Sequence, residues 1–305
     1  MSKLLKSKIV VLGLVAVLSL GVLAGCSSPA AEEKETSTET APAVEVVEEG
    51  QATTLEGHVN VVGSTSVTPV AQEIAEAFMA KEPGVKVDVQ GVGSSAGVKA
   101  ASDGSADIGM ASRNLKEGEK EWGLTEHVLA FDGIAVVVNP ANGVGELTAD
   151  QATAIFKGEI TNWKDVGGAD QEILVISREA GSGTRGAFEE LLDLEAENAE
   201  GKTISAVKKD ALVAEGNGAV KANVAKKEYA IGYLSLSYVD ETVKGVSIDG
   251  VAPSVDAIVA GEYNVSRPFL LLTKGELSPA AQAYMDFAFS EEGQAIVAEK
   301  LIPVQ

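Results

Sequence analysis

The chain has 305 residues and a formal net charge of −21 at pH 7, from 45 acidic and 24 basic residues. This balance excludes the basic surface that nucleic-acid binding requires, so we expect no nucleic-acid partner. An acidic protein that binds an anion must use local, directed donors in a closed pocket, because its long-range field repels the ligand.

The first 25 residues are typical of a bacterial signal peptide. A basic start is followed by an apolar stretch over residues 9–20, and residues 23–26 read Leu-Ala-Gly-Cys, which is similar to a bacterial lipobox. Cys26 is the only cysteine, so it cannot form an internal disulfide. The apolar stretch is short for a membrane span. We therefore predict lipidation of Cys26 and an anchor on the extracytoplasmic face of the cell membrane.

A flexible tether is predicted over residues 26–56. This segment is rich in Glu, Thr, Ala and Ser and poor in aromatic residues, so it lacks the apolar surface needed for a core. The remainder, residues 57–305, is long enough for one large or two modest α/β domains.

The first candidate ligand loop begins at Gly63. Residues 59–62 alternate as a strand does, and the loop Gly63-Ser-Thr-Ser-Val-Thr-Pro69 leads into apolar residues at helical spacing. Thr68 suits an N-cap and Pro69 a first helical position. The hydroxyls of Ser64, Thr65 and Ser66 are therefore expected beside the free N–H groups of a helix N-terminus.

A second loop, Gly91 to Gly97, follows a strand predicted over residues 85–89. Its glycine spacing is one residue too long for a dinucleotide-binding fingerprint. Residues 93–97 match the G-x-S-x-G pattern of hydrolases, with Ser95 in the nucleophile position. The only histidines, His58 and His127, are badly placed along the chain for such a triad. We favour Ser94 or Ser95 as a hydroxyl donor at a helix start.

Strand-like and helix-like stretches then alternate, which favours an α/β fold with parallel sheets. Asn139 to Gly145 and Lys244 to Pro253 are candidate boundaries. They predict two lobes with a cleft between them, one comprising residues 57–136 and 246–305 and the other residues 137–245. Further elements are expected as strands at 107–110, 133–138, 172–177, 230–234 and 268–272, and as helices from Thr148 to Phe156, from Ser278 to Phe289 and from Ser290.

The loop Arg178-Glu-Ala-Gly-Ser-Gly-Thr-Arg185 carries the strongest signal for a ligand. It joins a strand to a helix, where unpaired backbone N–H groups and the macrodipole favour an anion. Ser182 and Thr184 add hydroxyl donors, the glycines allow close approach, and Arg178 or Arg185 can direct two donors to one tetrahedral anion. The alternative is an ordinary glycine-rich turn with a solvated arginine.

Taken together, these loops resemble the phosphate-binding lipoproteins of bacterial ABC importers, which have the type II periplasmic-binding-protein fold. The motifs at 63–69, 93–97, 106–113, 131–135, 160–163 and 178–184 carry the resemblance. It implies a two-lobed α/β protein with a two-strand hinge, which captures inorganic phosphate for an ABC permease and is not an enzyme. It also implies these phosphate-binding residues: Ser64, Thr65, Ser66, Ser95, Ser112, Arg113, Asp132, Arg178, Ser182, Gly183 and Thr184.

Selectivity within this resemblance centres on Asp132. Some relatives have an aspartate near the Ser112-Arg113 position that accepts the ligand proton, and this chain does not. Asp132 is the candidate for that role or for a partner of Arg113, and a structural cap is the alternative. Sulfate, molybdate or tungstate are alternative ligands, and a secreted phosphatase is an alternative function.

The other conspicuous residues have structural explanations. Trp122 and Trp163 are expected to pack or to rim the cleft, and residues 116–121 are expected to form a solvated helical face. His58 and His127 lack metal-ligand spacing, so we expect no metal site and no cofactor. We expect a monomer.

Overall fold

The structure is a computed structural model that describes residues 54–304. The predicted signal peptide, Cys26 and nearly all of the tether lie outside the described residues. None of the helices between residues 54 and 304 is both long enough and apolar enough to cross a membrane.

The described part of the chain contains a mixed α/β arrangement, which confirms the predicted class. The strands are β1 (Gly57–Gly63), β2 (Val85–Gly91), β3 (Ile108–Ala111), β4 (Thr125–Val138), β5 (Glu146–Leu147), β6 (Leu174–Arg178), β7 (Glu195–Glu197), β8 (Thr203–Ser205), β9 (Leu212–Ala214), β10 (Ala230–Ser235), β11 (Lys244–Gly245), β12 (Ser247–Ile248), β13 (Ser266–Thr273) and β14 (Ile302–Pro303). The α-helices are α1 (Thr68–Lys81), α2 (Ser94–Asp103), α3 (Glu117–Lys120), α4 (Ala149–Lys157), α5 (Gly183–Leu191), α6 (Gly216–Lys226), α7 (Val255–Val259), α8 (Pro279–Ala288) and α9 (Glu291–Ala298).

The main sheet has the order β2-β1-β3-β13-β4-β10-β6-β9, and β11 and β14 each pair with β4. β1 runs parallel to β2 and β3, and β6 runs parallel to β10 and β9. β13 is antiparallel to β3 and β4, and β4 is antiparallel to β10. The sheet is therefore mixed where the sequence predicted parallel sheets, because β4 and β13 carry the chain in opposite directions between its two ends.

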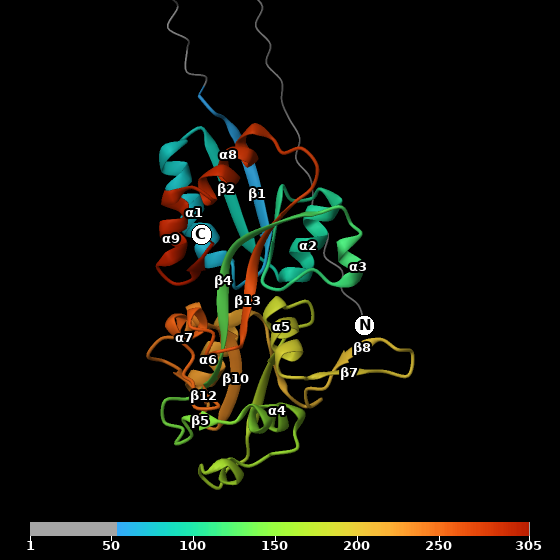
Figure 1. The fold of residues 1–305 in the computed structure, drawn as a ribbon, viewed down its shortest axis with the longest axis vertical. Helices are drawn as coiled ribbons and strands as arrows, with labels where there is room; N and C mark the ends of the chain where they lie inside the picture. The colour runs from blue at the N-terminus through green and yellow to red at the C-terminus, as the bar shows by residue number, and fades with distance from the viewer. Residues whose placement is uncertain (1–53, 305) are drawn as a thin grey trace, which may run out of the picture. The chain divides into compact units, whose positions relative to one another are not determined.

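β4 links the two ends of this sheet. Its residues 125–133 pair with β13, and its residues 134–138 pair with β10. Figure 1 shows β4 and β13 running together between a group with α1, α2, α8 and α9 and a group with α4 to α7. The boundaries predicted at 136/137 and 245/246 stay predictions. Val246 and Val265 share a core cluster with Phe156 and Phe188 of the other predicted lobe, which favours a later return of the chain, at β13.

The buried apolar residues form separate clusters in these two groups of elements. One cluster lies between β1 to β3 and the helices α1, α8 and α9, and includes Ile74, Phe78 and Tyr284. A second cluster is built on α4, α5 and the second half of β4, and includes Phe156 and Phe188. These apolar contacts hold the loops after β1, β3 and β6 in fixed positions.

Most of the predicted helix caps are present. Thr148, Ser278 and Ser290 each cap a helix through the side-chain oxygen, as their sequence contexts predicted. The prediction for Thr68 was wrong. Val67 is the N-cap of α1, and Thr68 Oγ1 instead donates a 2.9 Å hydrogen bond to the Ser64 carbonyl, since the chain already has helical dihedral angles at Val67.

Candidate anion-binding site

The N-terminal ends of α1, α2, α5 and α6 carry residues of one buried hydroxyl cluster. Ser66, in the loop before α1, has its Oγ atom 2.9 Å from Thr184 Oγ1 of α5. The same oxygen accepts a 2.9 Å hydrogen bond from Asn217 Nδ2 of α6. All three residues are at most 2% exposed. Helix N-termini present unpaired N–H groups and positive dipole ends, so their convergence favours an anion here.

Three serines continue the cluster on the side of β1 and β3. Ser64 Oγ donates to Ser112 Oγ over 2.8 Å, and the Ser112 backbone N–H donates to Ser94 Oγ over 3.1 Å. Each of the three is at most 1% exposed. The structure thus brings together Ser64, Ser66, Ser112 and Thr184, and of the two serines favoured at the start of α2 it places Ser94 in this cluster.

Glycines allow the two sides of the cluster to approach. A Cβ atom on Gly183 would overlap Ser94 Oγ and lie 2.6 Å from Ser112 Oγ. Gly181 has a φ of +89°, and its carbonyl accepts a 3.1 Å hydrogen bond from the Ser95 backbone N–H. Ser182, predicted as a ligand, uses its Oγ atom to accept the Arg185 N–H and so caps α5.

Arg178 lies at the end of β6, on the same side of the cluster as α5 and α6, and is 1% exposed. Its Nη2 atom donates to Thr65 Oγ1 over 3.2 Å, and its Nη1 atom donates to Asn217 Oδ1 over 3.1 Å. Nε and Nη2 each also donate to the Glu179 carboxylate over 2.8 Å. Burial acts to raise the pKa of Glu179, but the hydrogen bonds and the charge of Arg178, together with backbone N–H donors, outweigh it and lower that pKa. Glu179 therefore stays ionised and balances the guanidinium.

Arg113 is held in the same way, by Glu119. Nη1 and Nη2 of Arg113 donate to the two Glu119 oxygens over 2.7 Å and 2.9 Å, and Nη2 also donates to Ser95 Oγ over 3.2 Å. Burial acts to raise the pKa of Glu119, but hydrogen bonds from Arg113 and from the Lys116 backbone lower it. The prediction of a solvated face over residues 116–121 was wrong at Glu119, which is 8% exposed, because it pairs with Arg113.

Asp132 is buried and bonded to residues that the sequence did not link to it. Its Oδ2 atom accepts from Arg267 Nη2 over 3.1 Å, and its Oδ1 atom accepts from Ser235 Oγ over 2.9 Å. The suggested partnership with Arg113 is therefore wrong, since Arg113 is bound to Glu119. Burial raises the pKa of Asp132 and lowers the pKa of Arg267 to about 10. Arg267 Nη2 also donates to Ser66 Oγ over 3.1 Å, which connects the pair to the hydroxyl cluster.

Each arginine near the cluster thus has its own carboxylate. The pairs are Arg113–Glu119, Arg178–Glu179 and Arg267–Asp132. Their charges compensate locally, so an anion would be stabilised chiefly by directed donors: hydroxyls, helix N–H groups and guanidinium hydrogens. This is the arrangement expected for an acidic protein that binds an anion.

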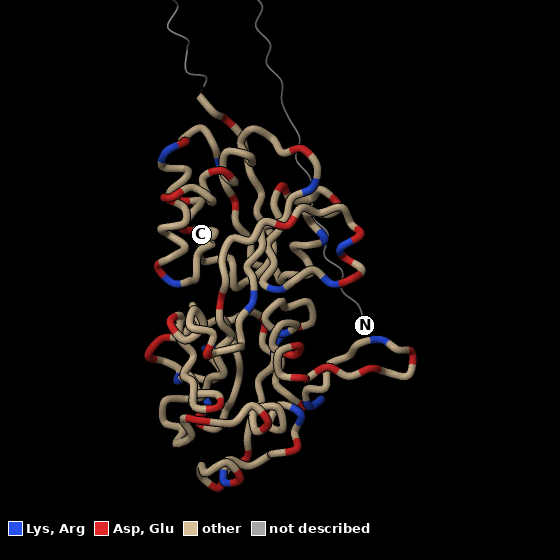
Figure 2. The backbone as a smooth tube through the Cα atoms, viewed as in Figure 1, with Lys and Arg blue, Asp and Glu red and all other residues tan. Residues whose placement is uncertain are grey.

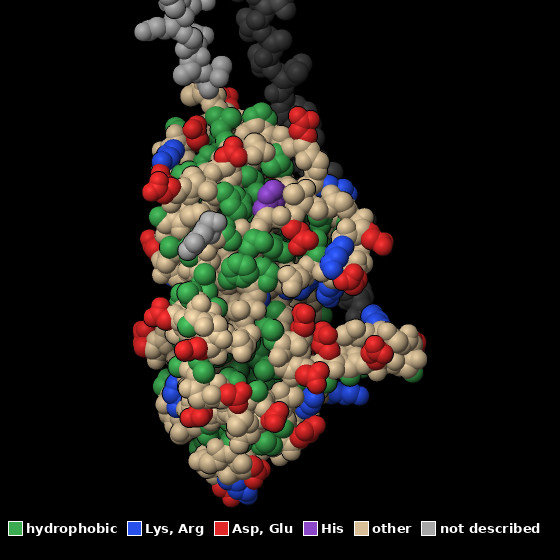
Figure 3. Space-filling model, viewed as in Figure 1, with side chains coloured by type: hydrophobic (Ala, Val, Ile, Leu, Met, Phe, Trp, Pro, Cys, Tyr) green, Lys and Arg blue, Asp and Glu red, His purple; other side chains and the backbone are tan. Residues whose placement is uncertain are grey.

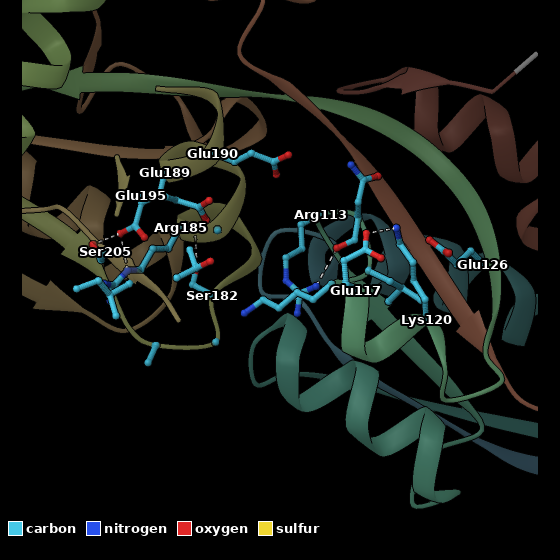
Figure 4. Close-up of a pocket in the computed structure, with 18 residues that line it drawn as sticks. Arg113, Glu117, Lys120, Glu126, Ser182, Arg185, Glu189, Glu190, Glu195 and Ser205 are labelled. Atoms are coloured by element: carbon cyan, nitrogen blue, oxygen red, sulfur yellow. Dashed lines mark hydrogen bonds and ion pairs between the residues drawn. The ribbon is translucent and has the colours of Figure 1, made fainter. Parts of the chain in front are cut away.

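A groove of about 890 Å³ lies beside the cluster. Arg113 and Ser182 line it, and Figure 4 shows Arg113, Glu117 and Lys120 on one side with Ser182 and Arg185 on the other. Arg185, one of the two predicted guanidinium donors, instead donates to Glu189 and to the Arg178 carbonyl. The groove offers a path from solvent to residues that border the cluster.

Acidic side chains prevail outside the site. Figure 2 shows Asp and Glu spread along both groups of elements and along the β7–β8 hairpin. On the face shown in Figure 3, Lys and Arg are scattered among them. The long-range field therefore does not supply the attraction for an anion, and the local donors must.

The remaining candidates have other partners. His58 Nε2 lies 2.7 Å from Asp88 Oδ2 and His127 Nε2 lies 2.9 Å from Thr273 Oγ1, so neither ring nitrogen is bonded to Ser95. Trp163 is 1% exposed and packs in the core, which confirms the packing interpretation. Trp122 is 39% exposed.

Sequence reasoning missed Asn217, Arg267 and Ser235. Asn217 stands in a Gly-Asn-Gly stretch that opens α6, and such a stretch is a signal of a helix start. Arg267 is the second residue of β13, and a charged residue before Pro268 at the start of an otherwise apolar strand is its signal in the sequence. Nothing in the sequence next to Ser235 indicates its bond to Asp132.

Comparisons with known proteins agree on one family. The model for the PBP superfamily domain matches residues 34–292. The phosphate-binding protein PstS of Bacillus subtilis is 34% identical over 98% of this chain and 95% of its own length. Among solved structures, a phosphate ABC transporter substrate-binding protein with bound phosphate from Clostridium perfringens is 45% identical, with a TM-score of 0.77 over 82% of this chain and all of that one. An ABC-type phosphate transport receptor from Vibrio cholerae is 40% identical, with a TM-score of 0.68 over 81% of this chain and all of that one.

Proposed function

The chain belongs to the PBP superfamily and, within it, to the phosphate-binding proteins of bacterial ABC importers, and we propose that it captures inorganic phosphate outside the cytoplasmic membrane and delivers it to the permease of its transporter. It has the type II fold of these binding proteins. The family consists of substrate-binding proteins, and no chemical step is proposed for this chain.

The convergence of four helix N-termini on buried hydroxyls and the Arg178 guanidinium carries this proposal. A tetrahedral oxyanion has acceptor oxygens in all directions, and this cluster offers donors from several elements at once. We propose the predicted ligands for this role, with Ser94 added, and Asp132 acting through Arg267 rather than at the anion itself.

Titration calorimetry on the folded part, residues 54–305, tests the ligand directly. Phosphate, sulfate, molybdate and tungstate are each titrated into ligand-free protein at neutral pH. Phosphate is expected to bind most tightly, because the relatives that are 34% and 45% identical to this chain are named for phosphate. Tighter binding of sulfate or molybdate would replace the proposed ligand with that anion.

A secreted phosphatase is the competing function, and it requires a base that can activate a nucleophile. Both histidines are bonded away from Ser95. We expect no release of p-nitrophenol from p-nitrophenyl phosphate by purified protein. Turnover that is lost in Ser95→Ala would favour the phosphatase.

We also propose that Cys26 carries the lipid anchor, and that the folded part acts as a monomer. Acyl chains contribute about 0.8 kcal/mol per buried CH₂ to membrane binding, so their loss should release the protein. Cys26→Ala is expected either to move the protein out of the detergent phase in a partitioning experiment or to leave it unprocessed, whereas Ser27→Ala should be processed and stay with the detergent. A Cys26→Ala protein that is still processed and retained with the detergent would remove the anchor assignment.

A further inference from the structure

The acceptor capacity of the Ser66 hydroxyl is fully used by protein donors. A hydroxyl oxygen accepts at two lone pairs and donates one proton. Ser66 Oγ accepts from Asn217 Nδ2 over 2.9 Å and from Arg267 Nη2 over 3.1 Å. Because a guanidinium and an amide NH₂ can only donate, the proton of Ser66 must point to its third neighbour, Thr184 Oγ1, at 2.9 Å.

The orientation of the Asn217 amide follows from its other contacts. Its Oδ1 atom faces the Ser235 backbone N–H at 3.2 Å and Arg178 Nη1 at 3.1 Å. Both of these groups are donors, so the amide oxygen must lie on their side and Nδ2 must face Ser66. The second Nδ2 hydrogen is directed at Thr65 Oγ1, 3.5 Å away. Asn217 therefore supplies donors to two predicted ligand residues at once.

Arg267 is fixed as a donor by its position in the sheet. It stands directly opposite Asp132 in the β4–β13 register, and their ion pair is 3.1 Å long with both side chains 1% exposed. Its Nε and Nη1 atoms are buried and have no hydrogen-bond partner among the described residues. This side of the cluster therefore has more buried donors than acceptors, as a site for an anion requires.

We propose that Asn217 and Arg267 are specificity-determining positioning residues, which force Ser66 to donate and so make its side of the site select unprotonated ligand oxygens. This inference rests on the proposed function. With Thr184 Oγ1 accepting from Ser66, the Thr184 proton is free to be donated to the anion. A ligand that carries a proton must direct it elsewhere, toward the side formed by Ser94 and Ser112.

A double-mutant cycle tests whether Asn217 acts through Ser66. Asn217→Asp keeps the shape and the Oδ1 acceptor but replaces the two donated hydrogens with lone pairs. We expect it to raise the dissociation constant for phosphate about 10- to 100-fold in the wild-type background, as loss of a charged hydrogen bond does. In a Ser66→Ala background, which removes the hydroxyl, Asn217→Asp should raise the dissociation constant by a factor that is at least about fivefold smaller. The rise that remains there measures the effect of the added negative charge.

The pH dependence of binding supplies a second readout that a merely structural role would not change. Phosphate affinity is measured below and above the second ionisation of the ligand. Wild type should favour the less protonated anion, and in Asn217→Asp this preference should fall by about fivefold or more, because Ser66 can then donate to the new carboxylate and expose a lone pair. The new carboxylate also repels the more highly charged anion, so the comparison is repeated in the Ser66→Ala background, where only this effect of charge should remain.

Exchange of the ion pair tests Arg267 separately. Arg267→Met combined with Asp132→Leu avoids leaving a buried charge unpaired, and it frees one lone pair of Ser66. This double variant should also raise the dissociation constant for phosphate less in the Ser66→Ala background than in the wild-type background, and thermal unfolding checks that it is folded.

The inference would be overturned if Asn217→Asp raised the dissociation constant equally in both backgrounds, or if it left the pH preference unchanged. If wild type binds sulfate and not phosphate, the proposed function fails, and the same double-mutant cycle measured with sulfate then tests the inference about Ser66. If wild type binds no oxyanion, both the proposed function and this inference are overturned.

Discussion

Gly183→Ala should weaken phosphate binding roughly 5- to 150-fold while leaving the fold intact. The new Cβ would overlap Ser94 Oγ and lie 2.6 Å from Ser112 Oγ, and both serines are fully buried. Overpacking of this kind costs roughly 1–3 kcal/mol, which corresponds to that range of affinity. Gly183 belongs to α5, whereas both serines belong to the opposite side of the cluster. The added methyl group should therefore push α5 away from Ser94 and Ser112.

The matched control is Gly186→Ala in the same helix. A Cβ at Gly186 would have one neighbour, Arg113 Cδ, at an ordinary 3.4 Å. Gly186→Ala should raise helix propensity and leave the unfolding temperature of the ligand-free protein the same or higher, whereas Gly183→Ala should lower it to the extent that its Cβ strains the contact with Ser94 and Ser112. Only Gly183→Ala should lose most of the further rise in unfolding temperature that phosphate produces. An equal rise in the two variants would mean that Gly183 does not approach Ser94 when phosphate is bound.

Local patterns sufficed to predict the loops of this site. Ser64 to Ser66 and Ser182 to Thr184 each follow a strand and precede a helix, and short hydroxyl side chains with glycine have few other uses at such positions. The elements themselves were also predictable, because apolar periodicity and caps such as Thr148 act within a few residues. The assembled fold agrees with these local preferences.

Contacts set by the sheet register could not be predicted. Asp132 meets Arg267 because β4 and β13 pair antiparallel with these residues opposite, although 135 positions separate them in the chain. A shift by one residue would place Arg267 on the other face, and no local pattern fixes that choice. Asn217 meets Ser66 across 151 positions for a similar reason, because the two ends of the sheet approach each other.

Arg178→Lys should weaken phosphate binding by about 1.5–3 kcal/mol, roughly 10- to 150-fold, although the charge is conserved. Three nitrogens of Arg178 donate at once to Thr65, Asn217 and Glu179. A lysine ammonium is a single point and cannot span these acceptors. It would leave the Asn217 Oδ1 atom with one donor and allow the Thr65 hydroxyl to turn, so the donor geometry at the anion would be lost as well as one contact.

Arg185→Lys is the control for this change, since it alters a guanidinium seven residues away in the same loop and helix start. Arg185 pairs with Glu189 and the Arg178 carbonyl, and its side chain is 24% exposed, so its substitution should change the phosphate dissociation constant by less than about threefold. Calorimetry on the three proteins gives both values. A wild-type dissociation constant for Arg178→Lys would mean that the guanidinium serves only to hold Glu179, and that the hydroxyls and helix N-termini bind the anion without it.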